Sequence, residues 1–251
     1  MSGFAGRRIL ITGGSSGVGR ACVEHFLDLG AHVGNLDLVP TTDHGASLHA
    51  QAIADVRDTA AVQGAVTSIA EDLGGLDVVV NNAGVSFIGG VEDGDADDWA
   101  RILDVNLGGY VRTIRAALPH LRRSAAASIV NVSSTTATSG FRRRALYSAS
   151  KGAIEAMTRS IAADLLAESI TVNAVNPGTV DTPFMDELAA RSADPAATRA
   201  AFDNRQPTGR MVRPEEVARA VAYCADPINR SLVGSTVVVD GGILACHITE
   251  A

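Results

Sequence analysis

The sequence predicts a doubly wound α/β fold, that is, a single domain with a mostly parallel seven-stranded sheet and helices on both faces. Three observations predict this fold. Short runs that are apolar throughout alternate with longer segments in which apolar residues recur at helical spacing. The first apolar run ends in a glycine-rich turn, and no internal repeat or low-complexity linker interrupts the 251 residues.

The apolar runs predict the strands, because a parallel sheet covered on both faces needs strands that are apolar on both sides. We expect strands over residues 8–12, 32–37, 46–54, 76–81, 128–132, 170–175 and 235–239, of which the third is the weakest. We expect helices over residues 18–30, 59–73, 96–123, 147–168 and 214–225. Glycines end the first two helices, and Pro214 suits the first turn of the last helix.

One long irregular stretch, about residues 180–212, separates the sixth strand from the last helix. In open α/β sheets, ligands bind in the crevice at the carboxyl ends of the strands, where this stretch begins. We therefore expect it to be a substrate-binding lid on a single domain that spans residues 1–251.

The composition excludes several classes of protein. An apolar content of 46% and a net charge of −7 argue against disorder, and no apolar run approaches the ~18 residues of a membrane span. The start of the chain lacks the pattern of a signal peptide, and an acidic chain does not favour a nucleic-acid partner. Cys22, Cys224 and Cys246 are far apart and odd in number, which favours a reducing compartment. We expect a cytoplasmic protein without a metal site.

A glycine-rich segment, residues 13–19, lies between the first strand and the first helix. A lone glycine-rich run could be only a tight turn. After the first strand of such a fold, however, its glycines let the backbone approach a pyrophosphate, and the helix N-terminus offers free amides to the anion. The expected cofactor contacts are Gly13, Ser15, Ser16, Gly17, Val18 and Gly19.

Asp37 ends the second strand, 18 residues beyond the glycine-rich segment, where a carboxylate can accept hydrogen bonds from both hydroxyls of a ribose. The same carboxylate repels the 2′-phosphate of NADP, and neither Ser16 nor Leu38 supplies a cation for that phosphate. We therefore expect NAD as the cofactor, with NADP less favoured. Asp55 and Val56 follow the third strand and could flank the adenine, although Asp55 could instead cap a helix.

Tyr147 and Lys151 are spaced i, i+4, which places them on one face of a helix. A tyrosine has an ordinary pKa of about 10, and a neighbouring ammonium favours its phenolate. Lys151 is the only lysine among 21 basic residues, since the other 20 are arginines. A tyrosine and a lysine at this spacing could be two surface residues of a helix. Because a guanidinium replaces a compact ammonium poorly, the pair is also a candidate for acid–base chemistry.

These motifs, together with three others, resemble the short-chain dehydrogenase/reductase family over essentially the whole chain. The others are Asn-Asn-Ala-Gly at residues 81–84, Ser134 thirteen residues before Tyr147, and Pro177-Gly178. The resemblance implies an enzyme that passes a hydride between nicotinamide C4 and a carbinol carbon. It also implies a homotetramer built partly from the helices that carry Asn106 and Tyr147, with a small-molecule substrate and no membrane partner.

The resemblance also assigns roles to individual residues. Tyr147 would exchange a proton with the substrate oxygen, and Lys151 would tune Tyr147 and hold the nicotinamide ribose. Ser134 would orient the substrate oxygen, with Ser133 as the structural alternative. Asn106 would hold a water in the proton relay, whereas Asn81 would stabilise the centre of the sheet. The implied cofactor contacts are Asn82, Ala83, Gly84, Tyr147, Lys151, Pro177, Gly178, Val180 and Thr182.

Arginines near the expected site bear on the substrate. Residues 142–144 are all arginine, and the lid carries Arg191, Arg199, Arg205 and Arg210. They could form a solvated face and salt bridges, or one or two of them could clamp a substrate carboxylate. Within the family, the 3-hydroxybutyrate and sugar(-acid) dehydrogenase subgroup resembles this chain at Arg144 and at residues 205–210, so Arg144 and Arg205 are the candidate substrate residues. A further arginine of that subgroup aligns near Leu188, which is not basic, and a neutral sugar or polyol therefore stays open.

Two alternatives to a hydroxy-acid or sugar dehydrogenase remain. A 3-oxoacyl-thioester (acyl carrier protein) reductase would usually prefer NADPH, and Asp37 speaks against that preference. A catalytically silent dinucleotide-binding regulatory protein would typically have lost Ser134, Tyr147 or Lys151, all of which are present.

Overall fold

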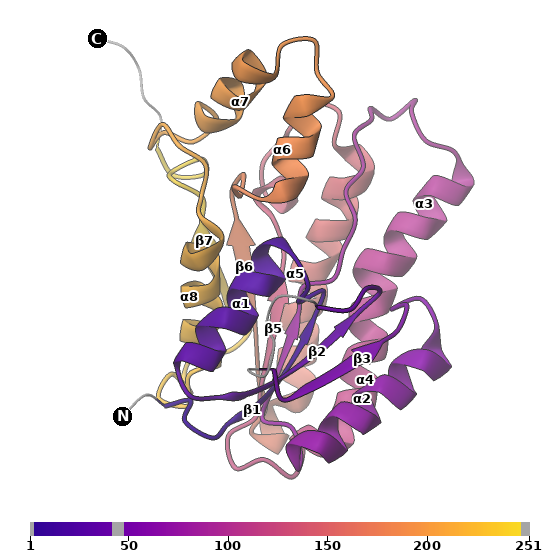
Figure 1. The fold of residues 1–251 in the computed structure, drawn as a ribbon, viewed down its shortest axis with the longest axis vertical. Helices are drawn as coiled ribbons and strands as arrows, with labels where there is room; N and C mark the ends of the chain where they lie inside the picture. The colour runs from indigo at the N-terminus through magenta and orange to yellow at the C-terminus, as the bar shows by residue number, and fades with distance from the viewer. Residues whose placement is uncertain (1–2, 42–47, 247–251) are drawn as a thin grey trace.

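A computed structural model describes residues 3–41 and 48–246 of the chain. Within these residues, seven strands form one sheet in the order β3-β2-β1-β4-β5-β6-β7, and each neighbouring pair is parallel. The predicted doubly wound α/β fold is confirmed (Figure 1). The strands are β1 (Arg8–Thr12), β2 (His32–Asp37), β3 (Ala50–Ile53), β4 (Val78–Asn81), β5 (Ser128–Val132), β6 (Thr171–Pro177) and β7 (Thr236–Val239).

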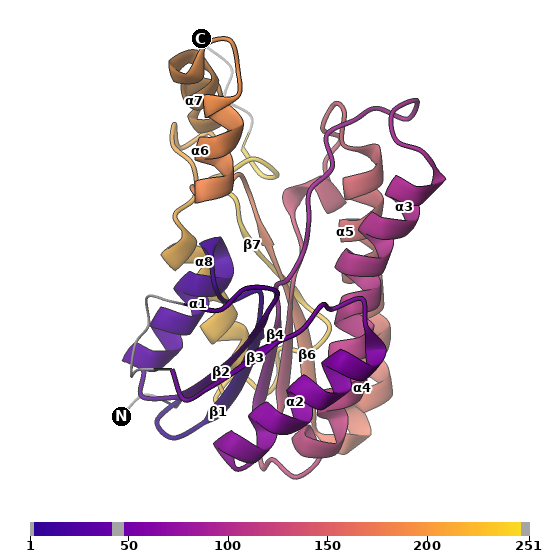
Figure 2. The ribbon, with the colours of Figure 1, turned by 45° about the vertical axis from the view of Figure 1, so that its right-hand side comes forward.

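Helices cover both faces of the sheet, with α1 and α8 side by side on one face and α2, α4 and α5 on the other (Figure 2). The α-helices are α1 (Gly17–Asp28), α2 (Thr59–Leu73), α3 (Ala96–Leu103), α4 (Gly109–Leu121), α5 (Ala145–Leu165), α6 (Pro183–Ala190), α7 (Pro195–Asp203) and α8 (Pro214–Ala225). Shorter turns are the π-helix η2 (Asp104–Gly108) and the 3₁₀ helices η3 (Thr135–Ala137) and η4 (Leu166–Glu168). No helix of the described residues is both long and apolar enough to cross a membrane.

Side chains that alternate along the strands fill two separate cores. Along β1, Ile9 and Ile11 pack in the cluster that includes residues of α1 and α8, whereas Leu10 packs in the cluster under α2 and α4. All three side chains are fully buried. Successive strand residues point to opposite faces, so a strand between two helical layers must be apolar at every position, as the sequence is here.

Four strands differ in their bounds from those predicted, and for the last of them, β7, the only change is a start at Thr236 in place of residue 235. The third strand is shorter than residues 46–54, since β3 begins at Ala50; residues 46 and 47 lie outside the described residues. β4 begins at Val78 rather than at residue 76, and Asp77 before it turns its carboxylate to Arg8. β6 continues beyond residue 175 to Pro177, because Pro177 still pairs with Val239 of the edge strand β7.

The single helix predicted over residues 96–123 is interrupted by the π-helical turn η2 between α3 and α4. Asn106 lies in this turn and is fully buried. Single π-helical turns widen a helix locally and are frequent at functional sites. Apolar periodicity does not reveal such a turn, because the helical pattern resumes after it.

The stretch predicted to be irregular, residues 180–212, contains two short helices, α6 and α7, so this prediction was wrong. Each begins with a proline in its first turn, and Asp194 caps α7 by accepting from the amide of Ala197. Met185, Ala189, Phe202 and Met211 form a small core of their own between them. The helices lie beyond the carboxyl ends of the strands (Figures 1 and 2).

Candidate active site

A pocket of about 910 Å³ lies at the carboxyl ends of the strands. Its walls come from the segments that follow β1, β2, β3, β4, β5 and β6, from α5 and from α6. Almost every residue predicted for the site lines this pocket. The three that do not are Ser15, Gly19 and Asn106.

The glycine-rich segment forms the turn from β1 into α1. Gly13 has a φ of 70°, a left-handed conformation that few residues other than glycine adopt. Ser16 precedes α1 without capping it through its side chain, so the first-turn amides keep no side-chain partner. A helix N-terminus of this kind, open to a pocket, binds an anion through its amides and its dipole.

Gly19 does not line the pocket but sets how closely α1 approaches the turn. A Cβ atom at this position would overlap the carbonyl oxygen of Gly13 and crowd the side-chain amide of Asn82. That amide of Asn82 donates to the carbonyls of Thr12 and Gly13, at 3.1 Å each. Asn82 therefore ties the segment after β4 to the glycine-rich turn, and its neighbours Ala83 and Gly84 line the pocket.

Asp37 lies at the end of β2 and lines the pocket as predicted. Its Oδ2 accepts from the amide of Ser15 at 2.9 Å, and its Oδ1 accepts from the amide of Leu38 at 2.7 Å. Ser15 thus orients Asp37 instead of facing the pocket. Among the described residues no cation pairs with Asp37, so its carboxylate retains acceptor capacity toward a ribose.

Asp55 and Val56 also line the pocket, near Asp37 at the ends of β2 and β3. Hydrogen bonds from Arg57, over 2.6–3.1 Å, lower the pKa of Asp55. Asp58, and not Asp55, caps α2 by accepting from the amides of its first turn. The capping alternative for Asp55 was therefore wrong.

Tyr147 and Lys151 lie one turn apart on α5 and line the same pocket. Lys151 is only 4% exposed, and its Nζ donates to the carbonyl of Val132 at 2.9 Å. The Nζ atom is 5.8 Å from the ring centroids of both Tyr147 and Tyr110. Burial lowers the pKa of Lys151 to about 8, and no carboxylate of the described residues pairs with it.

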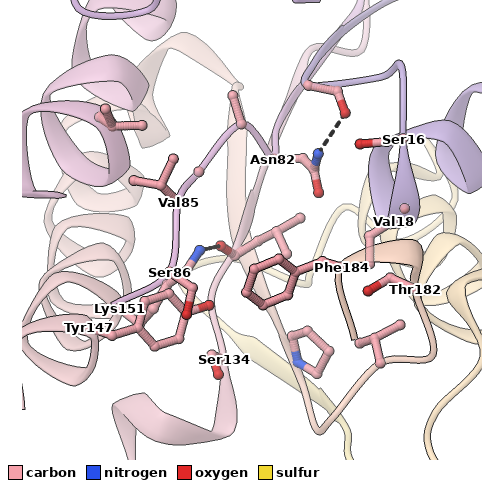
Figure 3. A pocket seen from close by; sticks show the side chains of 18 of the residues that line it. Ser16, Val18, Asn82, Val85, Ser86, Ser134, Tyr147, Lys151, Thr182 and Phe184 are labelled. Carbon is pink, nitrogen blue, oxygen red and sulfur yellow. Dashed lines mark hydrogen bonds between the residues drawn. The ribbon is translucent and has the colours of Figure 1, made fainter. Parts of the chain in front are cut away.

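Burial raises the pKa of Tyr147, while the Arg144 guanidinium and a hydrogen bond with Ser134 lower it. Ser134 follows β5 and lines the pocket, and Figure 3 shows it on the same side as Tyr147 and Lys151. The Ser133 hydroxyl is instead engaged by Glu155 Oε1 at 3.0 Å and by the carbonyl of Lys151 at 3.2 Å. This geometry leaves Ser134 as the serine available to a ligand.

Asn106 lies behind the pocket wall. Its Nδ2 donates to the carbonyl of Val85 and to Ser150 Oγ, both at 3.0 Å, and its Oδ1 accepts from the amide of Val85 at 2.8 Å. Ser150 in turn donates to the carbonyl of Tyr147 at 2.7 Å. Asn106 therefore joins the wall residue Val85 to the helix of Tyr147. None of these hydrogen bonds joins Asn106 to Lys151.

Asn81 is buried in the sheet, as the sequence suggested. Its Nδ2 donates to Asn131 Oδ1 on the neighbouring strand β5 at 2.9 Å. At the end of β6, Pro177, Gly178, Val180 and Thr182 all line the pocket.

Six of the seven arginines named for this region fall into two groups. Arg143, Arg191, Arg199 and Arg210 pair with carboxylates, so for them the salt-bridge interpretation is correct. Arg144 and Arg205 line the pocket instead, and neither pairs with a carboxylate of the described residues.

Arg144 and Arg205 are held by uncharged groups. The other arginines of the pocket lining, Arg57 and Arg101, each pair with a nearby carboxylate. Arg144 Nη1 donates to Ser86 Oγ at 3.0 Å and to the carbonyl of Phe87 at 3.2 Å, and the Arg205 guanidinium lies 4.7 Å from the ring centroid of Phe202. Burial lowers the pKa of both, and for Arg144 the charge of Arg205 adds to this effect. Two partly desolvated guanidiniums near Tyr147 form a place where an anion is favourable.

A family model described as enoyl-(acyl carrier protein) reductase matches residues 13–244 of the chain. The chain belongs to the short-chain dehydrogenase/reductase family. Relatives named as dehydrogenases agree with this assignment, so the protein is an enzyme of the oxidoreductase class. Its family uses nicotinamide cofactors, and the pocket described above is where such a cofactor and a substrate would meet.

This short-chain dehydrogenase/reductase is 36% identical to the L-fucose dehydrogenase of Mus musculus, over 95% of its own length and 89% of that protein's. It is also 36% identical to the cis-4-hydroxycyclohexanecarboxylate dehydrogenase of Sinomonas cyclohexanicum, over 96% of its length and 98% of the relative's. Among solved structures, the ligand-free aldohexose dehydrogenase of Thermoplasma acidophilum is similar with a TM-score of 0.90 and 33% identity. That match covers 98% of this chain and 97% of the other.

Phe184 and Ser86 are among the pocket residues that the sequence did not lead us to expect. Phe184 follows Thr182 and Pro183 at the start of α6, is 49% exposed, and points into the pocket (Figure 3). An aromatic residue that follows Thr182 and Pro183 directly, at the end of the segment after the sixth strand, was a usable signal. Ser86 follows the predicted strand-four motif by two residues, but nothing in the sequence connects it to Arg144.

Proposed function

We propose that this enzyme is an NAD-dependent dehydrogenase that interconverts a secondary alcohol of a small hydroxy acid, sugar or sugar acid with its carbonyl. The observation that carries the proposal is one continuous pocket with Ser134, Tyr147 and Lys151 on one wall and the unpaired carboxylate of Asp37 in its lining. Ser134, Tyr147 and Lys151 can transfer a proton and orient a substrate oxygen. Asp37 can accept hydrogen bonds from the hydroxyls of a ribose.

The residues present fit a dinucleotide. The uncapped first turn of α1 would hold the pyrophosphate, and Asp37 would accept from the adenosine ribose hydroxyls. Because Asp37 is already fixed by two backbone amides, it would meet a 2′-phosphate with an unscreened negative charge. Pro177, Gly178, Val180 and Thr182 would contact the nicotinamide end.

The chain's own residues would manage the proton. When bound, the nicotinamide cofactor accepts the hydride from the carbinol carbon in oxidation and returns it in reduction. Ser134 would hold the substrate oxygen by a hydrogen bond, and the Tyr147 phenolate would take the proton of the breaking O–H bond. In the reverse direction Tyr147 returns that proton to the carbonyl oxygen. Lys151 would supply positive charge next to Tyr147. Asn106 would hold the pocket wall at Val85 in a fixed position relative to α5.

Arg144 and Arg205 support an acidic substrate. A carboxylate placed near Tyr147 would find two guanidiniums that have no carboxylate partner among the described residues. The named activity of the Sinomonas relative, on a hydroxy carboxylate, accords with this chemistry. Residues 180–212, with α6 and α7, would act as the lid over this end of the pocket.

A screen of NAD reduction with hydroxy acids, aldoses, sugar acids and polyols tests the reaction class. We expect NAD(H) to bind at least about tenfold more tightly than NADP(H), since Asp37 repels the extra phosphate. Equal affinities by fluorescence titration would refute the argument from Asp37. Asp37→Ser should narrow the difference between the two cofactors.

For the acidic substrate, Arg205→Met should raise KM by about tenfold or more with little change in kcat. Arg191→Met is the matched control, because Arg191 is exposed and pairs with Glu187 outside the pocket. If Arg205→Met binds acid substrates as the parent and the control do, Arg205 is structural and does not bind the substrate.

The second candidate is a reductase of 3-oxoacyl thioesters; the description of the matching family model shares the acyl carrier protein substrate with it but names the enoyl reduction. It predicts turnover of an acetoacetyl thioester with NADPH in preference to NADH, the opposite of the cofactor choice derived from Asp37. One comparison of the two cofactors with that thioester distinguishes the candidates.

We also propose that the enzyme is a cytoplasmic homotetramer. Ala149 and Ala156 are exposed on α5, and small side chains on a helix face permit close helix packing between subunits. Light scattering after gel filtration measures the mass, and a monomer at micromolar concentration would exclude this assembly.

A further inference from the structure

Arg144 is placed to act on the catalytic tyrosine as well as on a substrate. It is the residue that precedes the first turn of α5, three positions before Tyr147, whereas Lys151 is four positions after it. Residues three and four apart on a helix are neighbours on one face. Tyr147 is therefore flanked along α5 by a guanidinium on one side and an ammonium on the other.

The guanidinium is fixed in place by groups that carry no charge. Its Nη1 donates to Ser86 Oγ and to the carbonyl of Phe87, both on the segment after β4. The same segment holds the backbone before α5, because the amide of Gly89 donates to the carbonyl of Arg143 at 2.9 Å. Arg143 has a φ of 58°, which is unusual for a residue other than glycine. The chain thus maintains a strained turn that anchors Arg144 beside the pocket.

The other cation near Tyr147 is already engaged. Lys151 Nζ donates to the carbonyl of Val132, and that carbonyl also accepts from Tyr110 Oη at 3.1 Å. The other arginines of the pocket lining are Arg205 in residues 180–212, Arg101 on α3, which pairs with Asp98, and Arg57, which pairs with Asp55. The acidic residues of the pocket lining, Asp37 and Asp55, belong to the ends of β2 and β3. Glu155 is directed to Ser133 and Asn176.

We propose that Arg144 is a positioning residue for the proton transfer: its guanidinium stabilises the phenolate of Tyr147 and shares this task with Lys151. The proposal rests on the proposed function only in taking Tyr147 as the base. The direction of the pKa effect on Tyr147, which Arg144 lowers, agrees with this geometry. It follows that an anionic substrate bound by Arg144 offsets part of the stabilisation, whereas a neutral alcohol leaves it intact.

The test is a titration of Tyr147 that needs no substrate. Tyrosinate and neutral tyrosine absorb at different ultraviolet wavelengths, and the chain has three tyrosines. Subtracting the titration of Tyr147→Phe from that of the purified full chain isolates Tyr147. The variants are Arg144→Gln and Arg144→Met, of which the second keeps the aliphatic stem of the side chain. Arg144→Lys retains a positive charge, and Arg205→Gln removes the guanidinium of Arg205 from the same pocket.

We expect the pH midpoint of the Tyr147 titration to rise in Arg144→Gln and Arg144→Met. In Arg144→Lys the midpoint should lie close to the parent value, and in Arg205→Gln it should change little. With a neutral secondary alcohol identified in the substrate screen, kcat/KM of Arg144→Gln at about pH 7 should fall by roughly 3- to 10-fold, while the alkaline plateau is retained. An unchanged midpoint in both Arg144→Gln and Arg144→Met overturns the proposal. A rise in Arg205→Gln as large as the rise in Arg144→Gln overturns it too. Near-normal turnover in Tyr147→Phe would instead refute the proposed function, so the two failures are distinguishable.

Discussion

Replacing the single lysine should make the protein more stable while it stops turnover. Lys151 is almost completely buried without a carboxylate partner among the described residues, and burial lowers its pKa from 10.5 to about 8. A lowering from 10.5 to about 8 corresponds to about 3 kcal/mol of destabilisation at neutral pH. Lys151→Met keeps the length of the stem and removes the charge.

The gain is reduced by the loss of the bond from Nζ to Val132, about 1 kcal/mol. The Val132 carbonyl keeps a partner, because Tyr110 Oη still donates to it. A net gain of about 2 kcal/mol should raise Tm by roughly 4–8 °C for a chain of this size. Turnover should be lost, a case in which a functional residue lowers stability.

The pH dependence gives the sharper test. The pKa of Lys151 in the folded state, about 8, is below its unfolded value of 10.5. Below about pH 8 both states carry the proton and the full cost applies; between about pH 8 and 10.5 the folded state releases the proton first, so the cost declines. Thermal unfolding by circular dichroism should therefore show Lys151→Met to be more stable than the parent near pH 7. This advantage should be lost near pH 10.5, where mainly the missing bond from Nζ to Val132 separates the two proteins.

A control variant on the same helix separates this effect from a general one. Arg159 is exposed on α5, so Arg159→Met should change Tm little and by the same amount at each pH. The reasoning is refuted if Lys151→Met is less stable than the parent at neutral pH. It is equally refuted if the stability difference does not depend on pH.

Three further predictions follow from single contacts. Tyr147→Phe should lose nearly all turnover and still bind NADH in a fluorescence titration, and a near-normal rate would remove Tyr147 as the base. Asp77→Asn should lower the free energy of unfolding in urea by about 2 kcal/mol at neutral pH. Burial raises the pKa of Asp77, but hydrogen bonds from Arg8 and Ser124 outweigh burial and lower the pKa from 3.8 to about 2. Because that stability is present above about pH 3.8 and lost as the pH falls through about 2, a pH-independent difference would contradict it. Gly19→Ala should weaken NAD binding by about tenfold or more through displacement of the Gly13 carbonyl, and unchanged affinity would show that the turn can relax.

The sheet and the glycine-rich turn were predictable because each depends on local chemistry. Ile9, Leu10 and Ile11 are apolar in succession, which suits a strand between two helical layers, and Gly13 adopts the positive φ that its residue type allows. Spacing alone placed Tyr147 and Lys151 one turn apart. These features do not depend on residues distant in the sequence.

The lid and the roles of the arginines depend on tertiary contacts and were not predictable in the same way. The lid helices are short, and their apolar residues Met185 and Phe202 face each other's helix rather than the main core. Arg199 and Arg205 are the same residue type in one segment, yet only Arg199 meets carboxylates, those of Asp181 and Asp186. The π-helical turn around Asn106 likewise leaves no trace in the apolar pattern.

The closure of the lid at its base has a consequence for how this enzyme could acquire new substrates. Val180 and Val212 form a bridge, and the amide of Val212 donates to the carbonyl of Thr179 at 2.9 Å, so the segment leaves and re-enters the body at neighbouring points. Since it also has an apolar core of its own, a lid of different length or sequence could be inserted between these points without disturbing the sheet. Under the proposed function, exchange of about thirty residues would then alter substrate choice, while β1, α1 and Asp37 would keep their proposed contacts with the cofactor.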